Sequence, residues 1–260
     1  MKYKSLPYKF EIRNRSMAYK DGELILDKGP DEKFYNRMLT NTDESNLRCV
    51  VVGGSPNILN YEYGGKIDLF DKVIRVNSSP TKNYEHHVGK VTNIWATSLN
   101  PGKTFDPKRW DNFYFPDELR DNEVWFRTIA TYEQYSPYIN RWFGNGINYR
   151  VLTTKMMKSP PKFTKKSSTP IGNGTIYTTG IQAILGALQL YKKVSILGFT
   201  FYTETKSDNN TTYPGITLSE NLKKHAKGNA SILQPFVEDE RLIFLHEEEE
   251  KNFKSILGIE

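Results

Sequence analysis

A turn of small and polar residues follows a run of three valines. Val50 to Val52 lead directly into the segment Gly53-Gly54-Ser55-Pro56-Asn57. Such a turn at the end of a buried strand can present backbone N–H groups to an anion such as a phosphate. The segment matches neither the G-x-G-x-x-G pattern of dinucleotide-binding folds nor the G-x-x-x-x-G-K-[ST] pattern of P-loops. An anion-binding turn and a strand-end turn without a ligand are therefore both open interpretations.

The opening of a helix predicted over residues 175–193 is a second candidate anion site. Thr178, Thr179 and Gly180 lie in its first turn. Free N–H groups at a helix N-terminus attract negative charge. Simple N-capping is the alternative, because threonine is also favoured at that position.

Two polar residues stand at the end of a strand predicted over residues 72–76. Asn77 follows the strand and can both donate and accept hydrogen bonds. Arg75 could pair with a phosphate. It could equally be the partner in a structural ion pair, because its neighbours in the strand are apolar.

Composition indicates a soluble globular protein with an anionic partner as one option. Of 260 residues, 37% are hydrophobic and 25% charged, and the formal net charge is +6. No segment approaches the ~18 apolar residues of a membrane span, and the basic N-terminus lacks the apolar core of a signal peptide. We expect a cytoplasmic protein, with peripheral membrane contact through the basic surface as an alternative. The charge also fits an anionic substrate, nucleic acid or a solvated surface.

The number of cysteines and the absence of an acidic metal-binding motif restrict the possible disulfide and metal sites. Cys49 is the single cysteine, so an internal disulfide and a cysteine-based zinc site are excluded. The sequence contains no D-x-D motif for a nucleotide-bound divalent metal. We therefore expect no metal requirement.

Alternating strands and helices must position these residues. Short β-branched runs recur at RCVVV, KVIRV, VTNIWAT, VWFRTI, YRVLT, KKVSILG and RLIFL. Continuous apolar runs are typical of parallel strands covered on both faces. With helices predicted over 175–193 and about 219–237, the pattern predicts a single doubly wound α/β domain over 47–260. Its ligand would lie at the carboxyl ends of the strands, where VVVGGSPN and VSILGFTFY end. Residues 1–46 are predicted to be an N-terminal extension packed on this domain, with a hairpin at Asp21-Gly22.

The order of several short motifs resembles that of a known family. Residues 49–95 resemble the large sialylmotif of eukaryotic-type sialyltransferases, and residues 175–202 resemble the small one. His225 stands where the last motif carries its histidine, and the bacterial lipooligosaccharide sialyltransferases share this layout. The points of similarity in the large motif are Cys49, Gly53, Ser55, Asn57, Tyr63-Gly64, Ile67-Asp68, Arg75-x-Asn77, Pro80-Thr81 and Val88-Gly89.

The resemblance implies a fold, an activity and a site. The fold would be Rossmann-like, a GT-A-like variant with about seven mostly parallel strands and helices on both faces. The activity would be inverting, metal-independent transfer of sialic acid from CMP-sialic acid to a sugar hydroxyl of a glycan or glycolipid. His225 would be the general base, and Tyr202 and Tyr213 would donate hydrogen bonds to the leaving phosphate. The donor would contact Gly53, Gly54, Ser55, Asn57, Asn77, Ser78, Thr97, Thr178, Thr179, Gly180, Gly198, Phe199 and Thr200.

Departures from the family pattern leave alternatives open. Gly54 replaces an asparagine that contacts the nucleotide in eukaryotic members, and Asn57 is the candidate substitute. The cysteine that pairs with the motif cysteine is replaced by Tyr191, so we expect Cys49 to be free and buried. A CMP-Kdo-dependent transferase and a CMP-binding protein without transfer activity are the alternatives. A nucleic-acid binder is the least favoured class, because no basic-aromatic module is present.

Overall fold

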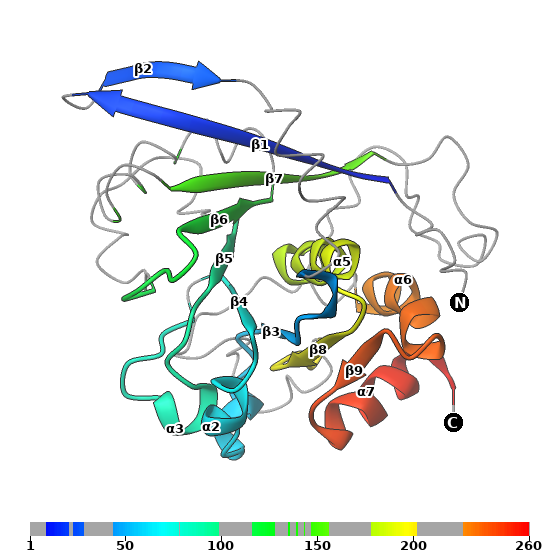
Figure 1. Ribbon diagram of the computed structural model, residues 1–260. Helices are drawn as coiled ribbons and strands as arrows, with labels where there is room; N and C mark the ends of the chain where they lie inside the picture. Colours follow the sequence, from blue (N-terminus) through cyan, green and yellow to red (C-terminus); the bar gives the residue numbers. More distant parts are fainter. Residues whose placement is uncertain are drawn as a thin grey trace, which may run out of the picture.

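A nine-stranded sheet organises the part of the chain that the structure describes. The computed structural model describes residues 9–20, 23–28, 44–77, 79–98, 116–127, 135, 139, 143, 147–155, 178–201 and 226–259. The strand order is β2-β1-β7-β6-β5-β4-β3-β8-β9 (Figure 1). The strands are β1 Lys9–Lys20, β2 Glu23–Lys28, β3 Cys49–Val52, β4 Lys72–Val76, β5 Ile94–Thr97, β6 Glu123–Phe126, β7 Asn148–Lys155, β8 Val194–Leu197 and β9 Leu242–Phe244.

Seven of these strands, β3 to β9, pair in parallel. The predicted α/β fold with about seven mostly parallel strands is therefore confirmed. Successive residues of β3 point to opposite faces of the sheet, and both faces are buried. Cys49 and Val51 belong to one apolar cluster, whereas Val50 and Val52 belong to another. Burial on both faces explains why the strand reads as a continuous apolar run.

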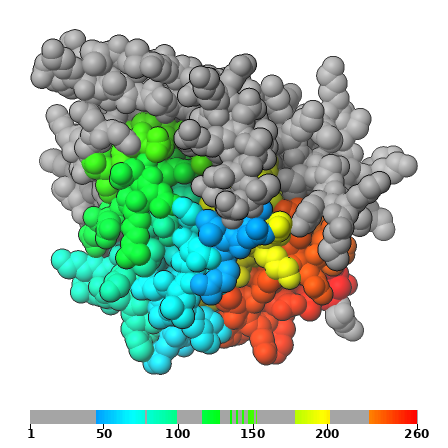
Figure 2. All heavy atoms as spheres, in the orientation of Figure 1, coloured from blue at the N-terminus to red at the C-terminus, as the bar shows by residue number. Residues whose placement is uncertain are grey.

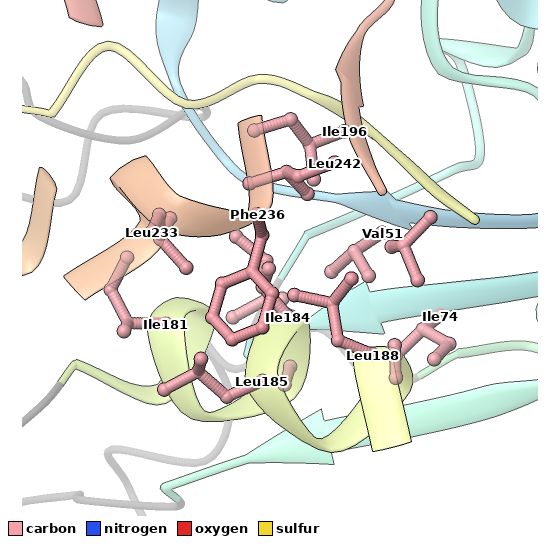
Figure 3. Close-up of a cluster of buried hydrophobic side chains, with 14 of the residues drawn as sticks. Val51, Ile74, Ile181, Ile184, Leu185, Leu188, Ile196, Leu233, Phe236 and Leu242 are labelled. Carbon is pink, nitrogen blue, oxygen red and sulfur yellow. The ribbon is translucent and has the colours of Figure 1, made fainter. Parts of the chain in front are cut away.

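Helices cover both faces of the sheet (Figure 1). Apolar residues of α5 and α6 pack with Val51, Ile74 and Ile196 of the sheet in the larger cluster (Figure 3). The opposite cluster contains Ile58, Ile67 and Val88, which come from η2, α2 and α3. The helical elements are η1 Glu44–Asn46, η2 Pro56–Asn60, α2 Gly64–Ile67, α3 Glu85–Val88, α5 Thr179–Leu190, α6 Ala226–Glu238 and α7 Glu247–Leu257.

The N-terminal strands extend the same sheet. β1 pairs antiparallel with β2 in a register that places Lys20 opposite Glu23, which confirms the predicted hairpin. β1 also pairs antiparallel with β7, at the edge of the parallel strands. Among the described residues, no helix has the length and apolar character needed to span a bilayer.

Helix α5 is shorter than the predicted 175–193. It begins after Thr178, whose Oγ1 accepts a hydrogen bond from Ile181 N over 3.4 Å. It ends before Tyr191, which is extended at φ −115° and ψ 141°. The next residue, Lys192, donates its backbone N–H to Ser45 O over 2.9 Å. The chain therefore leaves the helix to approach β3, although Lys192 and Lys193 would continue it by propensity. The predicted helix of about 219–237 corresponds to α6, and residues 219–225 lie outside the described part.

Cys49 provides a test of how tightly β3 is packed. Its side chain is 1% exposed and free of any disulfide, as expected. Burial raises the pKa of the thiol, and the charge of Lys72 opposes this only in part. Because the thiolate is the reactive species, we predict no reaction of the native protein with Ellman's reagent and one equivalent in guanidinium. A Lys66→Cys variant, with its thiol on the exposed face of α2, should gain one rapidly labelled thiol. Rapid labelling of native Cys49 itself would contradict the packing of β3.

Candidate nucleotide-binding site

The strand order reverses between β3 and β8. From β3 the chain proceeds through β4, β5, β6 and β7 in one direction, and β8 and β9 lie on the other side of β3. In open α/β sheets, ligands bind outside the carboxyl ends of strands at such a reversal. The turns that follow β3 and β8 are the two at which the sequence predicts the ligand to lie. In Figure 2 the segment after β3 (blue) lies beside the α5–β8 segment (yellow).

The two turns are in direct backbone contact. Gly53 N donates to Leu197 O over 2.8 Å, and Ser55 N donates to Gly198 O over 3.1 Å. A Cβ atom at Gly53 would lie 2.3 Å from Gly198 O, and one at Gly198 would lie 2.8 Å from Gly53 O. Gly198 also adopts φ +79°, a conformation that other residues rarely take. Gly53 and Gly198 are both among the donor contacts that the resemblance implies. In the structure, a side chain at either glycine would clash with the backbone oxygen of the other, so each position requires glycine.

The N-terminus of α5 reaches the same place. A Cβ atom at Gly180 would lie 2.7 Å from Cε1 of Phe199, and one at Gly53 would lie 3.1 Å from Cε2 of the same ring. The Phe199 ring therefore lies against both glycines. Thr178 is the N-cap of α5, which confirms the capping interpretation of that residue. Capping leaves the N–H groups of Thr179 and Gly180 at the positively polarised end of the helix.

Ser55 carries an unsatisfied polar atom in this turn. Its side chain is 5% exposed, and its Oγ has no hydrogen-bond partner. Although Ser55 is the N-cap of η2, its hydroxyl does not cap that helix. Buried hydroxyls are nearly always hydrogen-bonded, so an unpaired one at a strand end is consistent with a ligand partner.

Asn77 is held in a defined orientation at the end of β4. Its φ is 55°, which asparagine tolerates better than most residues. Its Oδ1 accepts hydrogen bonds from Ser98 N over 3.0 Å and from Ser98 Oγ over 3.2 Å. Trp95 Nε1 donates to its carbonyl oxygen over 2.7 Å. The side-chain oxygen is thus already engaged, and the Nδ2 hydrogens are the groups left to contact a ligand.

Arg75 does not face a phosphate site. It is 1% exposed. Its Nε donates to Val91 O over 3.0 Å, and its Nη2 donates to Val88 O over 2.7 Å. The phosphate alternative is therefore wrong, because the guanidinium lies inside the fold and secures the loop after α3. The hydrogen bonds described for the guanidinium go to two backbone carbonyl oxygens and to Thr92 Oγ1, and the ion-pair alternative stays a prediction.

The remaining predicted contacts differ in their exposure. Thr97 is fully buried at the end of β5, and its carbonyl oxygen accepts from Arg127 N over 3.2 Å. Gly54, Asn57 and Thr200 are partly exposed near the two turns. The predicted residues Ser78, Tyr202, Tyr213 and His225 lie outside the described residues.

Three polar residues of this region were not selected from the sequence. Glu249 of α7 is 1% exposed, and its Oε1 accepts from Gly198 N over 2.7 Å. It lies in the acidic run Glu247 to Glu250, in the first turn of α7, whose N-cap is His246. Gln182 is a polar residue between apolar residues of α5, a signal that could have drawn attention to it. Arg127 was placed inside a predicted strand, but β6 ends one residue earlier.

The fold and the site together define a class of protein. A parallel α/β sheet whose glycine-containing turns meet a helix N-terminus at the strand-order reversal is typical of nucleotide-binding domains. The family model for glycosyltransferase family 29 (sialyltransferase) matches residues 2–226. The chain belongs to this family. The match extends to the N-terminal residues, about which the motifs alone gave no information.

Individual relatives and solved structures agree with this assignment. A mouse lactosylceramide alpha-2,3-sialyltransferase is 25% identical over 193 residues, which span 68% of this chain and 46% of the relative. A rat type 2 lactosamine alpha-2,3-sialyltransferase is 28% identical over 223 residues, which span 74% and 61%. The chain thus spans about half the length of curated relatives that it matches. A mammalian sialyltransferase in complex with Gal-beta-1-3GalNAc-ortho-nitrophenol has a similar fold, with a TM-score of 0.51, 18% identity, and coverage of 80% of this chain and 72% of that one.

The contact between the two turns can be tested with matched glycine substitutions. We predict that Gly53→Ala lowers the free energy of unfolding by about 1–3 kcal/mol, because backbone atoms of Gly198 must move. Gly65→Ala is the control, since a Cβ atom there meets nothing within 4 Å. Gly65 lies in α2, so alanine should leave stability unchanged or raise it slightly. Equal chemical denaturation midpoints for the Gly53→Ala and Gly65→Ala variants would contradict the close approach.

Proposed function

We propose that the chain is an inverting, metal-independent sialyltransferase that moves sialic acid from CMP-sialic acid to a sugar hydroxyl of a glycan or glycolipid. Family membership supports the reaction class. The observation that carries the proposal is the convergence of Gly53, Gly180 and Phe199 at the strand-order reversal. Both motifs that carry the resemblance contribute to this one place. The names of these two relatives refer to lactosylceramide and lactosamine, which supports a glycan or glycolipid acceptor.

The described residues supply several contacts for an anionic nucleotide donor. Ser55 Oγ is a buried hydroxyl without a partner, and the Nδ2 group of Asn77 is a donor at the end of a neighbouring strand. The N–H groups at the start of α5 favour a carboxylate or phosphate oxygen. In this proposal the turn after β3 and Asn77 bind CMP, and the start of α5 binds the carboxylate of the sugar.

Transfer requires a proton acceptor and a stabilised leaving group. The acceptor hydroxyl oxygen forms a bond to the anomeric carbon as the bond from that carbon to the phosphate oxygen breaks. His225 takes the hydroxyl proton, because an imidazole has a suitable pKa near neutral pH. The bonding electrons leave with CMP, and the hydroxyl groups of Tyr202 and Tyr213 donate hydrogen bonds to its phosphate. Attack from the face opposite to CMP inverts the anomeric configuration.

Metal independence is part of the proposal. Within the described residues, no group of three or more histidine, cysteine, aspartate or glutamate side chains could hold a metal ion. Hydroxyl and backbone N–H donors are an alternative means of stabilising the charge that develops on the phosphate.

Donor choice is the direct test of the proposed function. We predict that CMP-sialic acid releases CMP in the presence of a galactose-terminated acceptor, and that EDTA leaves the rate largely intact. CMP-Kdo has a similar carboxylate and anomeric centre and serves as the competing donor. Turnover of CMP-Kdo alone would contradict the donor assignment. A rate that EDTA abolishes and Mg²⁺ restores would contradict metal independence. Tight CMP binding without transfer to any acceptor would favour a binding protein.

The role of His225 predicts a specific kinetic effect. His225→Ala should lower kcat by about 10²–10⁴-fold, the usual contribution of a positioned general base, with little change in CMP affinity. The wild-type rate should fall as the pH decreases through the pKa of the imidazole, about 6.5 if unperturbed, because only the neutral form accepts a proton. His86→Ala is the control, since His86 is exposed and pairs with Glu62 over 2.9 Å. A folded His225→Ala variant with a near wild-type rate would refute this role.

A further inference from the structure

Helix α5 runs antiparallel to the parallel strands, so its first turn lies at their carboxyl ends. Gly180 at its start contacts Phe199, which follows the end of β8. Lys192, just after its end, bonds to Ser45, which precedes β3. Between these ends Gly186 packs on β6 and β7, because a Cβ atom there would lie 3.1 Å from Trp125 and 3.2 Å from Leu152.

Two polar residues, Arg127 and Gln182, follow this contact toward the carboxyl edge of the sheet. Arg127 lies two residues beyond Trp125 and on the same face, about 6.6 Å nearer the carboxyl edge. Its N–H bonds to Thr97 O, so the ladder with β5 continues to this residue. Gln182 lies four residues before Gly186 on the same face of α5, about 6 Å nearer the same edge. Arg127 and Gln182 are thus displaced by similar distances from the Gly186–Trp125 contact, toward the same edge of the sheet. We therefore expect both to lie near the carboxyl ends of β5 and β6.

Arg127 has no acidic partner among the described residues. It is partly buried. The loss of hydration lowers the pKa of its guanidinium, and no carboxylate in the described part of the chain opposes that effect. Arg150 on the neighbouring strand shows the contrasting case, since its Nη2 donates to Glu123 Oε2 over 3.2 Å. A partly dehydrated guanidinium without a counter-ion is well suited to an oxyanion.

Gln182 is also incompletely satisfied. Its side chain is 6% exposed, and its Oε1 has no hydrogen-bond partner. A leucine would fill a similar volume in this apolar helix without leaving a buried acceptor unpaired. Polar groups that are buried and unpaired are uncommon in native proteins and require an explanation.

We propose that Arg127 and Gln182 form a subsite for an oxyanion of the sugar nucleotide and for a hydrogen-bond donor next to it. Arg127 pairs with a carboxylate or phosphate, and Gln182 Oε1 accepts from an adjacent hydroxyl or amide N–H. This inference rests on the proposed function for the identity of the ligand. It adds two contacts outside the motif residues to which the resemblance gave a role.

The test compares Arg127→Gln and Gln182→Leu with Arg120→Gln. Arg120 is the matched control, because it is an arginine in the turn that precedes β6, at the opposite edge of the sheet. Affinities for cytidine, CMP and CMP-sialic acid are measured by calorimetry without an acceptor. We expect Arg127→Gln to weaken CMP-sialic acid binding about 10- to 100-fold, a range typical of charge-assisted hydrogen bonds, and Arg120→Gln to have no effect. Arg127→Lys should lie between, since it keeps the charge and loses the planar fork.

The ligands distinguish the two oxyanions. If Arg127→Gln weakens CMP-sialic acid binding and leaves CMP binding unchanged, the arginine binds the sugar carboxylate. If both affinities fall and that of cytidine does not, it binds the phosphate. Unchanged affinities for all three ligands, or equal losses in Arg120→Gln, would overturn the proposal.

Thermal unfolding gives a readout that a purely structural role would not reproduce. Gln182→Leu should keep or raise the Tm while weakening CMP-sialic acid binding, because it removes an unpaired buried acceptor. A lower Tm with unchanged affinity would show that Gln182 only supports the fold.

A final measurement separates this inference from the proposed function. If the wild-type chain binds none of the three ligands, the proposed function fails. The subsite is then decided by inorganic phosphate, which should raise the Tm of wild type and Arg120→Gln more than that of Arg127→Gln. Equal shifts in all three proteins would overturn the subsite.

Discussion

The carboxyl-end edge of the sheet depends on one contact, the approach of the Gly53 backbone to that of Gly198. Two parallel strands can carry their turns this close only if neither turn has a Cβ atom between them. Glu249 of α7 holds the turn after β8 by accepting a hydrogen bond from Gly198 N. Ser55 N donates to Gly198 O and so links the turn after β3 to the turn after β8. This contact also determines where Phe199 and the start of α5 lie, because the Phe199 ring packs against both Gly53 and Gly180.

Helix α5 connects this edge to the core. All of its residues from Thr179 to Leu188 are buried, so the helix is fixed by packing along most of its length. Such extensive burial determines the position and the rotation of the helix against the sheet. The same packing therefore places its first turn at the carboxyl ends of the strands. Gln182 and Ser55 are two of the residues in the described part of the chain that carry a buried polar atom without a hydrogen-bond partner. Ser55 acquires a partner from the donor in the proposed function, and Gln182 acquires one in the further inference, which would explain why the fold tolerates both.

The sequence predicted the existence of the strands and helices better than the residues at which they begin and end. The seven apolar runs were sufficient to locate the seven parallel strands, because a strand covered on both faces is apolar along its whole length. Arg127 was included in a strand because a single charged residue at the end of an apolar run does not mark where pairing stops. The helix was extended over Lys192 and Lys193 for a similar reason, since their local propensity is helical and only the bond to Ser45 shows that the chain turns away. The roles of Ser78, Tyr202, Tyr213 and His225 stay predictions, because these residues lie outside the described part of the chain.

By itself, the sequence determined the fold class, the parallel sheet, the free buried cysteine and the two turns that meet at its edge. These properties follow from local composition and from the order of motifs along the chain. Tertiary structure alone decided that Arg75 supports a loop from within the core, that Glu249 accepts a hydrogen bond from Gly198, and that Gly186 of α5 packs on Trp125 and Leu152. Each of these relations joins residues far apart in the chain or on different elements. Hydrophobic periodicity specifies which face of an element is buried, but the partner of a buried polar group depends on how separate elements pack in three dimensions.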